Sequence, residues 1–406
     1  MEKNIRKFYW YRLTKFSLFH IAILVLFYQE RGLSFSQIMI LQSVYYFAKV
    51  LSEVPTGALA DRWGRKKALV LGSFCHSFAY LMIFFSHSLI LFMLGEILAG
   101  IAMSFAYGAD SALAYDTLKR LGKSEDYQRI EGKANSMRHL GFAIFAPLGG
   151  LLATIDLSLP YLASSIGIFF SGLIALTLVE PPREGGSGED SILNTRKKSY
   201  YEIRKSFDLL LRDRRILWFV LFFSLIFLAT RLGFWTYQPY MKLVGLPLSL
   251  VGIAFAAFHL FSAVVSRQAD RMERLLREKL MLLLMPILVV VSFVLLSRFL
   301  VLWAILFILI QQMTTALHEP VLKTYVNRHT PSEVRATMLS VQHMAGNAAF
   351  AIFAPFLGSL VDQFRLENAL LIFALVVIIF LVLLWRYRLR WFKPICSQFD
   401  HLEEET

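Results

Sequence analysis

Long apolar runs recur along this chain, and they limit the folds open to it more than any other feature. Many are long enough to cross a bilayer core about 30 Å thick. Apolar residues make up 57% of the chain and charged residues 17%, against about 25% charged residues in an ordinary soluble domain. A soluble protein of 406 residues could not bury so much apolar surface. Each run is expected to be helical, because backbone groups in lipid must bond within their own segment.

Polar turns divide the apolar sequence into twelve predicted spans. The spans lie at 13–29, 36–57, 68–86, 89–117, 130–155, 159–179, 215–241, 248–266, 280–297, 299–322, 336–360 and 368–385. The first run lacks a small-x-small cleavage site, so it is interpreted as a span and not as a signal peptide. The expected fold is therefore an all-α membrane protein with twelve transmembrane helices.

The Lys and Arg residues are distributed unevenly between the two sides of such a bundle. Of the 42 in the chain, 33 fall in the N-terminal segment and in every second connection, and only four in the intervening turns. This bias predicts that both termini are cytoplasmic and that the protein is a multi-pass protein of the cell (inner or plasma) membrane. Anionic lipid at the inner leaflet explains the net charge of +13 without a nucleic-acid partner.

Short repeats divide the spans into two sets of six. The pentapeptide AIFAP occurs at 143–147 and 351–355, and ADR occurs at 60–62 and 269–271, with nearly the same offset. Two such matches on equivalent spans indicate a duplicated six-helix unit, so two pseudo-symmetric bundles are expected. The predicted domains are an N-terminal bundle (1–180), a cytoplasmic linker (181–213), a C-terminal bundle (214–390) and a cytoplasmic tail (391–406). Apolar spacing from Tyr200 onward predicts an amphipathic helix in the linker.

A charged motif, GALADRWGRK at 57–66, separates the second and third spans. Gly57 would let two helices approach closely, and Gly64 would permit a tight turn. Asp61 could accept hydrogen bonds from the N-terminus of a facing helix, where the dipole is positive. The basic residues Arg62, Arg65 and Lys66 could pair with carboxylates at the inner ends of other spans. The alternative is that all of these charges are only positive-inside anchors.

We interpret the motif as part of a cytoplasmic gate that holds the two halves together and opens when they move apart. The acids expected to partner its basic residues are Glu53, Asp110 and Asp116. The second half carries a partial copy without the glycines, at Asp270 and Arg271.

Twelve spans, a central cytoplasmic loop and this motif together resemble the major facilitator superfamily, and the overall look is similar to its small bacterial exporters. The resemblance implies a secondary transporter that works by alternating access without a cofactor, with spans one, five, seven, eight and eleven among those lining a central cavity. Two positions depart from family patterns. Glu96, four residues before Gly100, stands where proton-driven members often carry Arg, and FAPLGG at 145–150 differs from the GPxxGG of drug antiporters.

Ionisable side chains well inside the spans are candidates for cargo contact, because placing them in lipid costs several kcal/mol. The candidate cavity residues are His20, Arg138, His139, Arg231, His259, His343 and Asn347. No Asp or Glu is comparably central in the predicted spans, so the arginines favour a carboxylate, phosphate or sulfate group on the cargo. Alternatively, each arginine extends toward the membrane surface or binds a helix carbonyl, and each histidine is packed and neutral. A further option is that one histidine carries a proton.

The sequence therefore predicts a secondary active transporter of a small organic solute. Export of an amphiphilic or anionic compound is the first hypothesis, and import of an organic anion is the second. An enzyme or a channel ranks lower, because the chain has no HExxH, GxSxG or Gly-rich phosphate loop and neither the re-entrant loops nor the charged rings of a channel. Two cysteines argue against a disulfide framework or a thiol metal site. The expected partners are the substrate, the lipid bilayer and, as an option, protons, for a protein that works as a monomer.

Overall fold

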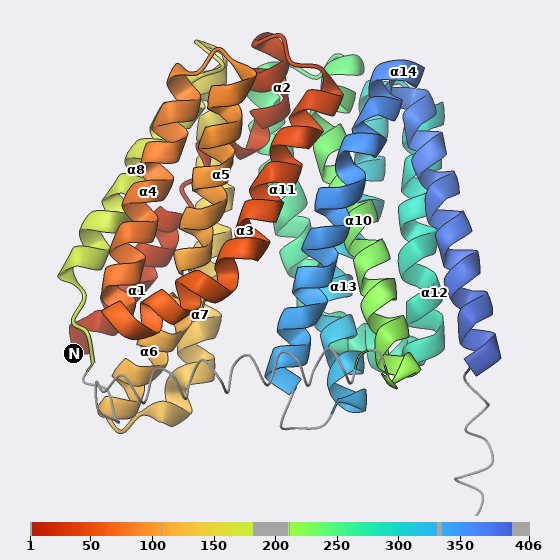
Figure 1. The fold of residues 1–406 in the computed structure, drawn as a ribbon. Helices are drawn as coiled ribbons and strands as arrows, with labels where there is room; N and C mark the ends of the chain where they lie inside the picture. The colour runs from red at the N-terminus through yellow and green to blue at the C-terminus, as the bar shows by residue number, and fades with distance from the viewer. Residues whose placement is uncertain (1, 107, 182–209, 211, 331–334, 392–406) are drawn as a thin grey trace, which may run out of the picture.

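Helices stand side by side through the whole structure (Figure 1). A computed structural model describes residues 2–106, 108–181, 210, 212–330 and 335–391, and no strand occurs among them. Short turns at 31–34, 86–88, 154–158, 244–247 and 299–301 lie at one end of the bundle, which we call the turn end. The opposite end, with the N-terminus and α6, is called the linker end and is at the bottom of Figure 1.

The N-terminal half contains the first six spans. Its helices are α1 (Glu2–Lys15), η1 (Phe19–Ala22), α2 (Leu24–Glu30), α3 (Phe35–Trp63), α4 (Arg65–Phe85), α5 (Leu89–Ala106), α6 (Ala109–Arg120), η2 (Ser124–Asp126), α7 (Tyr127–Ala153) and α8 (Leu159–Thr177). Within this half α4 packs between α8 and α5, and α3 packs on α5.

The C-terminal half contains the other six spans. Its helices are α10 (Arg214–Leu243), α11 (Leu248–Arg267), α12 (Ala269–Arg298), η3 (Leu302–Phe307), α13 (Ile308–His329) and α14 (Arg335–Trp391). Here α10 packs on α13 and α14, and α12 lies against both of them. Between the halves, α3 runs along α14 and α7 runs along α11, so these two pairs form the interface.

The described helices account for the twelve predicted spans. Eight are long and apolar enough to cross a membrane, or nine if the bent pair α1–α2 is one span. One of the eight, α14, contains two predicted spans, because Arg365 takes φ +57° and breaks the helix. The remaining two spans are α3 and α7, which are not counted among the eight because their sequences are more polar.

Three of the predicted spans are helical but are not uniform α-helices. The first predicted span, 13–29, belongs to α1, η1 and α2, with a break around Ile23. The fourth, 89–117, is divided into α5 and α6 just before Ala109, where Gly108 takes φ +81°. The tenth, 299–322, begins as the 3-10 helix η3 before α13. Most other boundaries lie within three residues of those predicted, as for α8 and α11.

Polar side chains compensate the backbone groups freed by the first of these breaks. The backbone N–H of Val25 donates to Gln238 Oε1 at 2.8 Å, and Gln238 Nε2 donates to the Ile21 carbonyl at 3.0 Å. The His20 N–H donates to Ser164 Oγ at 3.2 Å. Irregular backbone is tolerated at membrane depth only with such partners, so the break is a stable part of the fold.

The predicted linker helix, from Tyr200, and the tail 391–406 lie almost wholly outside the described residues. The domain boundaries at 180/181, 213/214 and 390/391 therefore stay predictions. Among the few described linker positions, Leu210 is buried in the apolar core.

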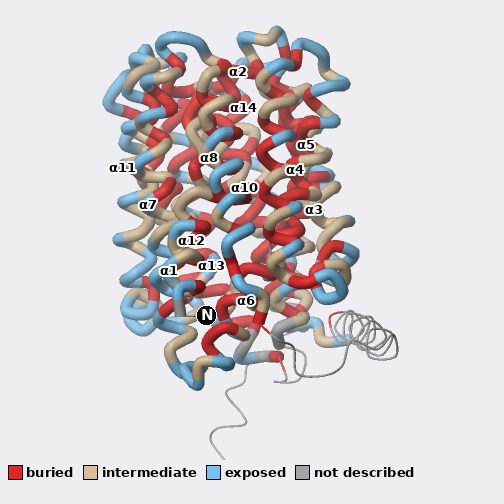
Figure 2. Tube along the Cα trace, turned by 90° about the vertical axis from the view of Figure 1, so that its left-hand side faces the viewer, coloured by how far each residue is buried: buried red, intermediate tan, exposed pale blue. Residues whose placement is uncertain are grey.

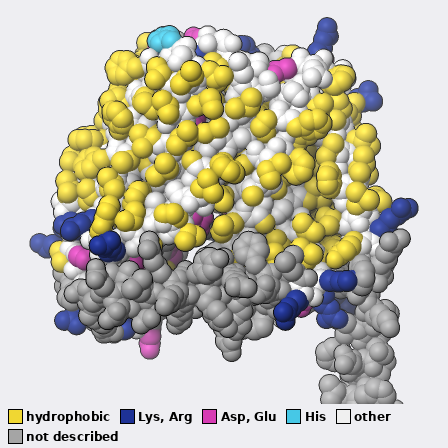
Figure 3. All heavy atoms as spheres, viewed as in Figure 1, with side chains coloured by type: hydrophobic (Ala, Val, Ile, Leu, Met, Phe, Trp, Pro, Cys, Tyr) yellow, Lys and Arg dark blue, Asp and Glu magenta, His cyan; other side chains and the backbone are white. Residues whose placement is uncertain are grey.

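The outer surface of the bundle is apolar around its middle. On the face in Figure 3, hydrophobic side chains form a broad band, and Lys and Arg side chains gather toward its two rims. Large apolar side chains such as Phe85 and Ile90 are more than two thirds exposed. In Figure 2 buried residues occupy the interior, whereas the turns at the upper end of the view are largely exposed. This is the arrangement expected of a protein surrounded by lipid.

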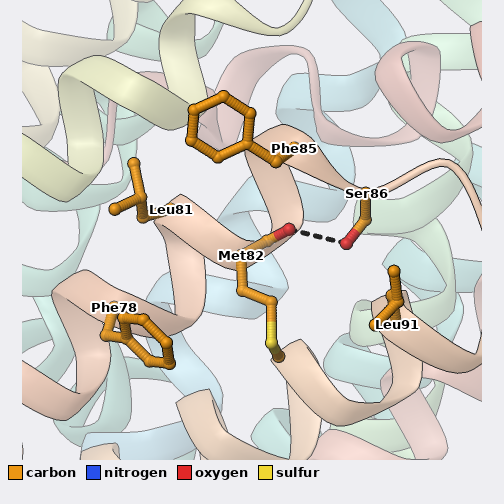
Figure 4. A pocket seen from close by; sticks show the side chains of 6 residues that line it. All are labelled: Phe78, Leu81, Met82, Phe85, Ser86 and Leu91. Carbon is orange, nitrogen blue, oxygen red and sulfur yellow. Dashed lines mark hydrogen bonds between the residues drawn. The ribbon is translucent and has the colours of Figure 1, made fainter.

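A hollow of about 260 Å³ opens on this apolar surface beside the turn between α4 and α5. Figure 4 shows its lining residues, Phe78, Leu81, Met82, Phe85, Ser86 and Leu91. The single hydroxyl among them, Ser86 Oγ, donates to the Met82 carbonyl at 2.6 Å. With no charge and no unpaired polar group in its lining, the hollow is part of the lipid-facing surface and not the candidate cargo site.

Candidate functional site

The charged motif at 57–66 forms the turn between α3 and α4 at the linker end. Gly64 takes φ +111°, a conformation that suits glycine, and this position allows the predicted tight turn. The carboxylate of Glu180 accepts hydrogen bonds from the backbone N–H groups of Arg65, at 2.8 Å, and Lys66, at 2.6 Å. An acid at a helix N-terminus is stabilised by the helix dipole. Sequence reasoning assigned this kind of contact to Asp61 and missed Glu180.

The motif's basic side chain Arg65 finds its partners inside the N-terminal half. Its Nη1 donates to the Ala112 carbonyl at 2.6 Å and forms an ion pair with Asp116, and both partners lie on α6. Asp61 and Arg62 are exposed, and a Cβ on Gly57 would meet nothing within 4 Å. In this conformation no described ion pair or hydrogen bond joins the motif to the C-terminal half.

The other expected gate residues are spread more widely. Asp110 pairs with Arg12 of α1 at 2.9 Å, and no described ion pair joins it to the motif. Glu53, on α3, is half-buried within electrostatic range of Lys49. Asp270 and Arg271 are exposed in the first turn of α12, with no described ion pair.

Five of the seven cavity candidates lie along the interface between the halves, and all five are half-buried: Arg138 and His139 on α7, Arg231 on α10, His259 on α11 and His343 on α14. His259 lies within electrostatic range of Arg138, His139 and Arg231. Its ring also stacks on Phe142 of α7, with 4.9 Å between ring centroids. Arg231 of the C-terminal half lies within range of Tyr45 and Lys49 on α3. We call these five residues the central basic cluster.

Neither arginine of the central basic cluster has a carboxylate partner within ion-pair distance among the described residues. The Arg138 guanidinium lies 5.7 Å from the Phe16 ring centroid, and its buried Nε has no hydrogen-bond partner. The Arg231 guanidinium lies 5.1 Å from the Phe227 ring centroid. An aromatic face attracts a cation but does not neutralise it, so both arginines keep the capacity to bind an anion.

One acid, Glu319 on α13, lies nearer to this cluster than the sequence indicated. Its charge interacts with Arg138 and His139 across the interface. Glu319 Oε1 lies 2.7 Å from Lys323 Nζ and 3.9 Å from His343 Nε2. The lysine already compensates this carboxylate, so the positive charge of the arginines remains in excess.

The remaining two cavity candidates have no described contact with the cluster. His20 is buried inside the N-terminal half, with its Nδ1 2.9 Å from Ser164 Oγ and its ring stacked on Tyr161. Asn347 is buried on α14, one helical turn beyond His343. The structure therefore brings together five of the seven residues singled out in the sequence.

Four hydrogen bonds between described residues join the two halves, and all four lie toward the turn end. Gln238 of α10 makes two, with Val25 and Ile21. Asp362 of α14 accepts the other two, from the Phe35 N–H at 2.9 Å and the Ser36 N–H at 2.8 Å. We call these four bonds the turn-end closure. Sequence reasoning missed both side chains, because Gln238 is not ionisable and Asp362 lies beside a turn.

Inside the N-terminal half a second polar site surrounds Glu96 of α5, which the sequence flagged only as a departure from the family pattern. Its Oε1 accepts hydrogen bonds from Tyr28 OH at 2.6 Å and Gln42 Nε2 at 3.0 Å. Across the described part of the chain, no group of three or more His, Cys, Asp or Glu residues could hold a metal ion.

Comparison with known proteins identifies the family of the chain. A sequence model of the Major Facilitator Superfamily matches residues 13–309 and 260–394. The chain is 22% identical over 165 residues to the quinolone resistance protein NorA of Staphylococcus aureus, covering 40% of this chain and 41% of that protein. It is 28% identical over 140 residues to the class H tetracycline resistance protein of Pasteurella multocida, covering 34% and 33%. The chain thus matches about two fifths or less of these curated relatives' length.

Solved structures share the fold over almost the whole chain. The nucleoside transporter NupG has a TM-score of 0.80 at 12% identity, covering 96% of this chain and 99% of that one. A D-xylose-proton symporter has a TM-score of 0.71 at 12% identity, covering 94% and 96%. Likeness at such identity concerns the fold alone. The family match spans most of the sequence and the helices form the corresponding two bundles, so the chain belongs to the major facilitator superfamily.

Proposed function

We propose that this transporter exports a small anionic or amphiphilic organic compound by alternating access, as a monomer in the cell membrane with both termini in the cytoplasm. The observation that carries the proposal is the pair of arginines in the central basic cluster, Arg138 and Arg231, which lie at the interface without carboxylate partners. Guanidinium groups bind carboxylates, phosphates and sulfates in paired hydrogen bonds. Each bundle supplies one arginine, so an anion bound between them would contact both halves.

The proposed orientation rests on the distribution of charge. The linker end carries the basic motif, and the excess of Lys and Arg at that end favours a cytoplasmic location. In this orientation the turn-end closure seals the outer side, and the central basic cluster belongs to a conformation closed to the outside. Export is preferred over import because the partial matches among curated proteins are named for drug resistance.

Ligand-induced thermal stabilisation tests the anion preference. The purified protein is screened against matched anionic and cationic organic solutes, together with Arg138→Gln, Arg231→Gln and the exposed-site control Arg298→Gln. Anionic solutes are expected to raise the melting temperature of the wild type and of the control. Binding to the two cluster variants should be at least about tenfold weaker, because a buried charge-assisted hydrogen bond contributes about 1.5–3 kcal/mol. Stabilisation by cations alone, unaffected by either cluster variant, would show that the cargo class is wrong.

Transport in vesicles of known orientation tests the direction and the class of protein. An exporter concentrates the solute on the side of the turn end when an ion gradient is imposed, and an importer concentrates it on the other side. A channel would not concentrate the solute, and an enzyme would change it chemically, so either of those results would contradict the proposal.

A further inference from the structure

Glu96 presents a carboxyl group inside the N-terminal half that the central basic cluster does not use. The residue is 6% exposed, and it lies about 10 Å from the turn-end start of α5 at the helical rise of about 1.5 Å per residue. Its two hydrogen-bond donors are Tyr28 OH and Gln42 Nε2. No Lys, Arg or His of the described chain lies within ion-pair distance of it.

The groups that face Glu96 from the surrounding helices are neutral. Four tyrosines lie within electrostatic range of it: Tyr28 on α2, Tyr45 on α3, Tyr80 on α4 and Tyr161 on α8. A buried carboxylate without a cationic partner is costly, and binding a proton removes that cost. The surroundings of Glu96 therefore suit a group that gains and loses a proton.

Both donors to Glu96 belong to the segments that make the turn-end closure. Tyr28 lies on α2, three residues from Val25, whose N–H donates to Gln238 of the other half. Gln42 lies on α3, whose first residues donate to Asp362 of the other half. An ionised Glu96 accepts strongly from both donors and so holds α2 and α3 together. A protonated Glu96 is a weaker acceptor, which loosens the same two segments.

Buried polar atoms continue from this site toward the linker end. The Tyr161 ring stacks on His20, with 4.6 Å between centroids; Tyr80 lies 4.5 Å from His20 and 4.6 Å from His76. Two side chains along this column have buried polar atoms without a hydrogen-bond partner: both ring nitrogens of His76, and Lys15 Nζ. Such atoms are rare in proteins and are usually satisfied by internal water. The column thus suits water-mediated proton movement between Glu96 and the linker end.

We propose that Glu96 is a proton-binding residue and that its protonation opens the turn-end closure, which couples transport to protons. The proton comes from bulk water, and it returns to water when the carboxyl ionises. With the turn end open, Glu96 exchanges its proton with the outer solution; with the turn end closed, as here, it exchanges through the polar column. The inference rests on the proposed function as an alternating-access transporter but not on the charge of the cargo.

The test measures the distance between the two halves at the turn end as a function of pH. Spin labels are placed at the exposed positions Ile155→Cys and Lys242→Cys of the full chain, with Cys75→Ser and Cys396→Ser, in lipid nanodiscs. As pH falls, the ratio of the long-distance to the short-distance population is expected to rise, by at most about tenfold per pH unit for one proton. Glu96→Gln, which cannot ionise, should show a raised long-distance population that does not change with pH. The matched control Glu30→Gln, at the exposed end of α2, should respond as the wild type does.

A pH response in Glu96→Gln equal to that of the wild type would overturn the proposal, and so would a wild type without any response. If Glu96→Gln does not fold, Tyr28→Phe decides the question. The Tyr28→Phe variant keeps the Glu96 carboxyl but removes one hydrogen bond to its ionised form. The pH at which the distance population changes should therefore rise. If that pH is the same as in the wild type, the proposal is contradicted. If anionic solutes do not stabilise the protein but the pH response still depends on Glu96, the proposed cargo class is wrong and the inference about Glu96 is unaffected.

Discussion

Arg12 shows how a single residue organises charge inside the N-terminal half. The residue is 8% exposed. Its Nε lies 2.9 Å from Asp110 Oδ2, and its Nη2 lies 3.0 Å from Glu131 Oε1 and 2.9 Å from Ser111 Oγ. In the sequence Arg12 counted only as a basic residue of the N-terminal segment. Its structural role arises because α1, α6 and α7 meet at the linker end.

Replacing Arg12 with leucine should strongly destabilise the protein. The change leaves the carboxylates of Asp110 and Glu131 without their cation, and breaking a buried pair in this way costs about 3–5 kcal/mol. The matched control is Arg129→Gln, which removes the exposed pair with Asp126 and should cost no more than about 1 kcal/mol. Thermal unfolding in detergent compares the two variants; equal shifts would show that the Arg12 contacts are energetically unimportant.

At the scale of helices, the sequence located the spans well but not their breaks or their contacts. Hydropathy predicted α8 at 159–179 and α11 at 248–266, close to the observed Leu159–Thr177 and Leu248–Arg267. The break at Ile23 could not be predicted in this way, because its compensating partner Gln238 lies more than 200 residues further along the chain. The hydrogen bonds of Glu96 were missed for a similar reason: its donors Tyr28 and Gln42 come from other spans.

The crossing of α7 and α11 gives a prediction at this scale. A Cβ on Gly252 would overlap the Ala146 carbonyl and lie 2.8 Å from Pro147 Cα, and both are backbone atoms that cannot rotate away. Gly252→Ala should therefore push the halves apart at the turn end, at a cost of about 1–3 kcal/mol to the closed conformation. The turn-end distance measurement should show a long-distance population raised by about 5- to 150-fold.

The control for this prediction is Gly132→Ala on α7, the helix that α11 crosses. A Cβ there meets nothing within 4 Å, so this change should leave the distance distribution as in the wild type and slightly favour the helix, by up to about 1 kcal/mol. An unchanged distribution in both variants would mean that the close helix crossing does not hold the turn end closed.

At the scale of the whole molecule, the described hydrogen bonds between the two halves lie at one end of the bundle. All four described inter-half hydrogen bonds lie toward the turn end, whereas the described side-chain bonds of Arg65 in the motif at 57–66 go to α6 of the N-terminal half. The sequence predicted this motif as a gate between the halves, which requires a conformation with the linker end closed. A sequence carries the residues for every state of a transporter, but one structure displays the contacts of one state, so the gate stays a prediction.

Gly57 allows this gate to be tested, because its surroundings must differ between the two states. Here the residue is exposed and a Cβ would meet nothing within 4 Å. Gly57→Leu should therefore leave the stability of this conformation nearly unchanged, within about 0.5 kcal/mol. If closing the linker end brings another helix against Gly57, the leucine side chain will obstruct it. Transport should then fall at least about tenfold, while the spin-label distance stays at its turn-end-closed value. Leu94→Trp, an equally bulky change at an exposed position of α5, should leave transport intact; normal transport by Gly57→Leu would show that no close helix approach occurs at this residue.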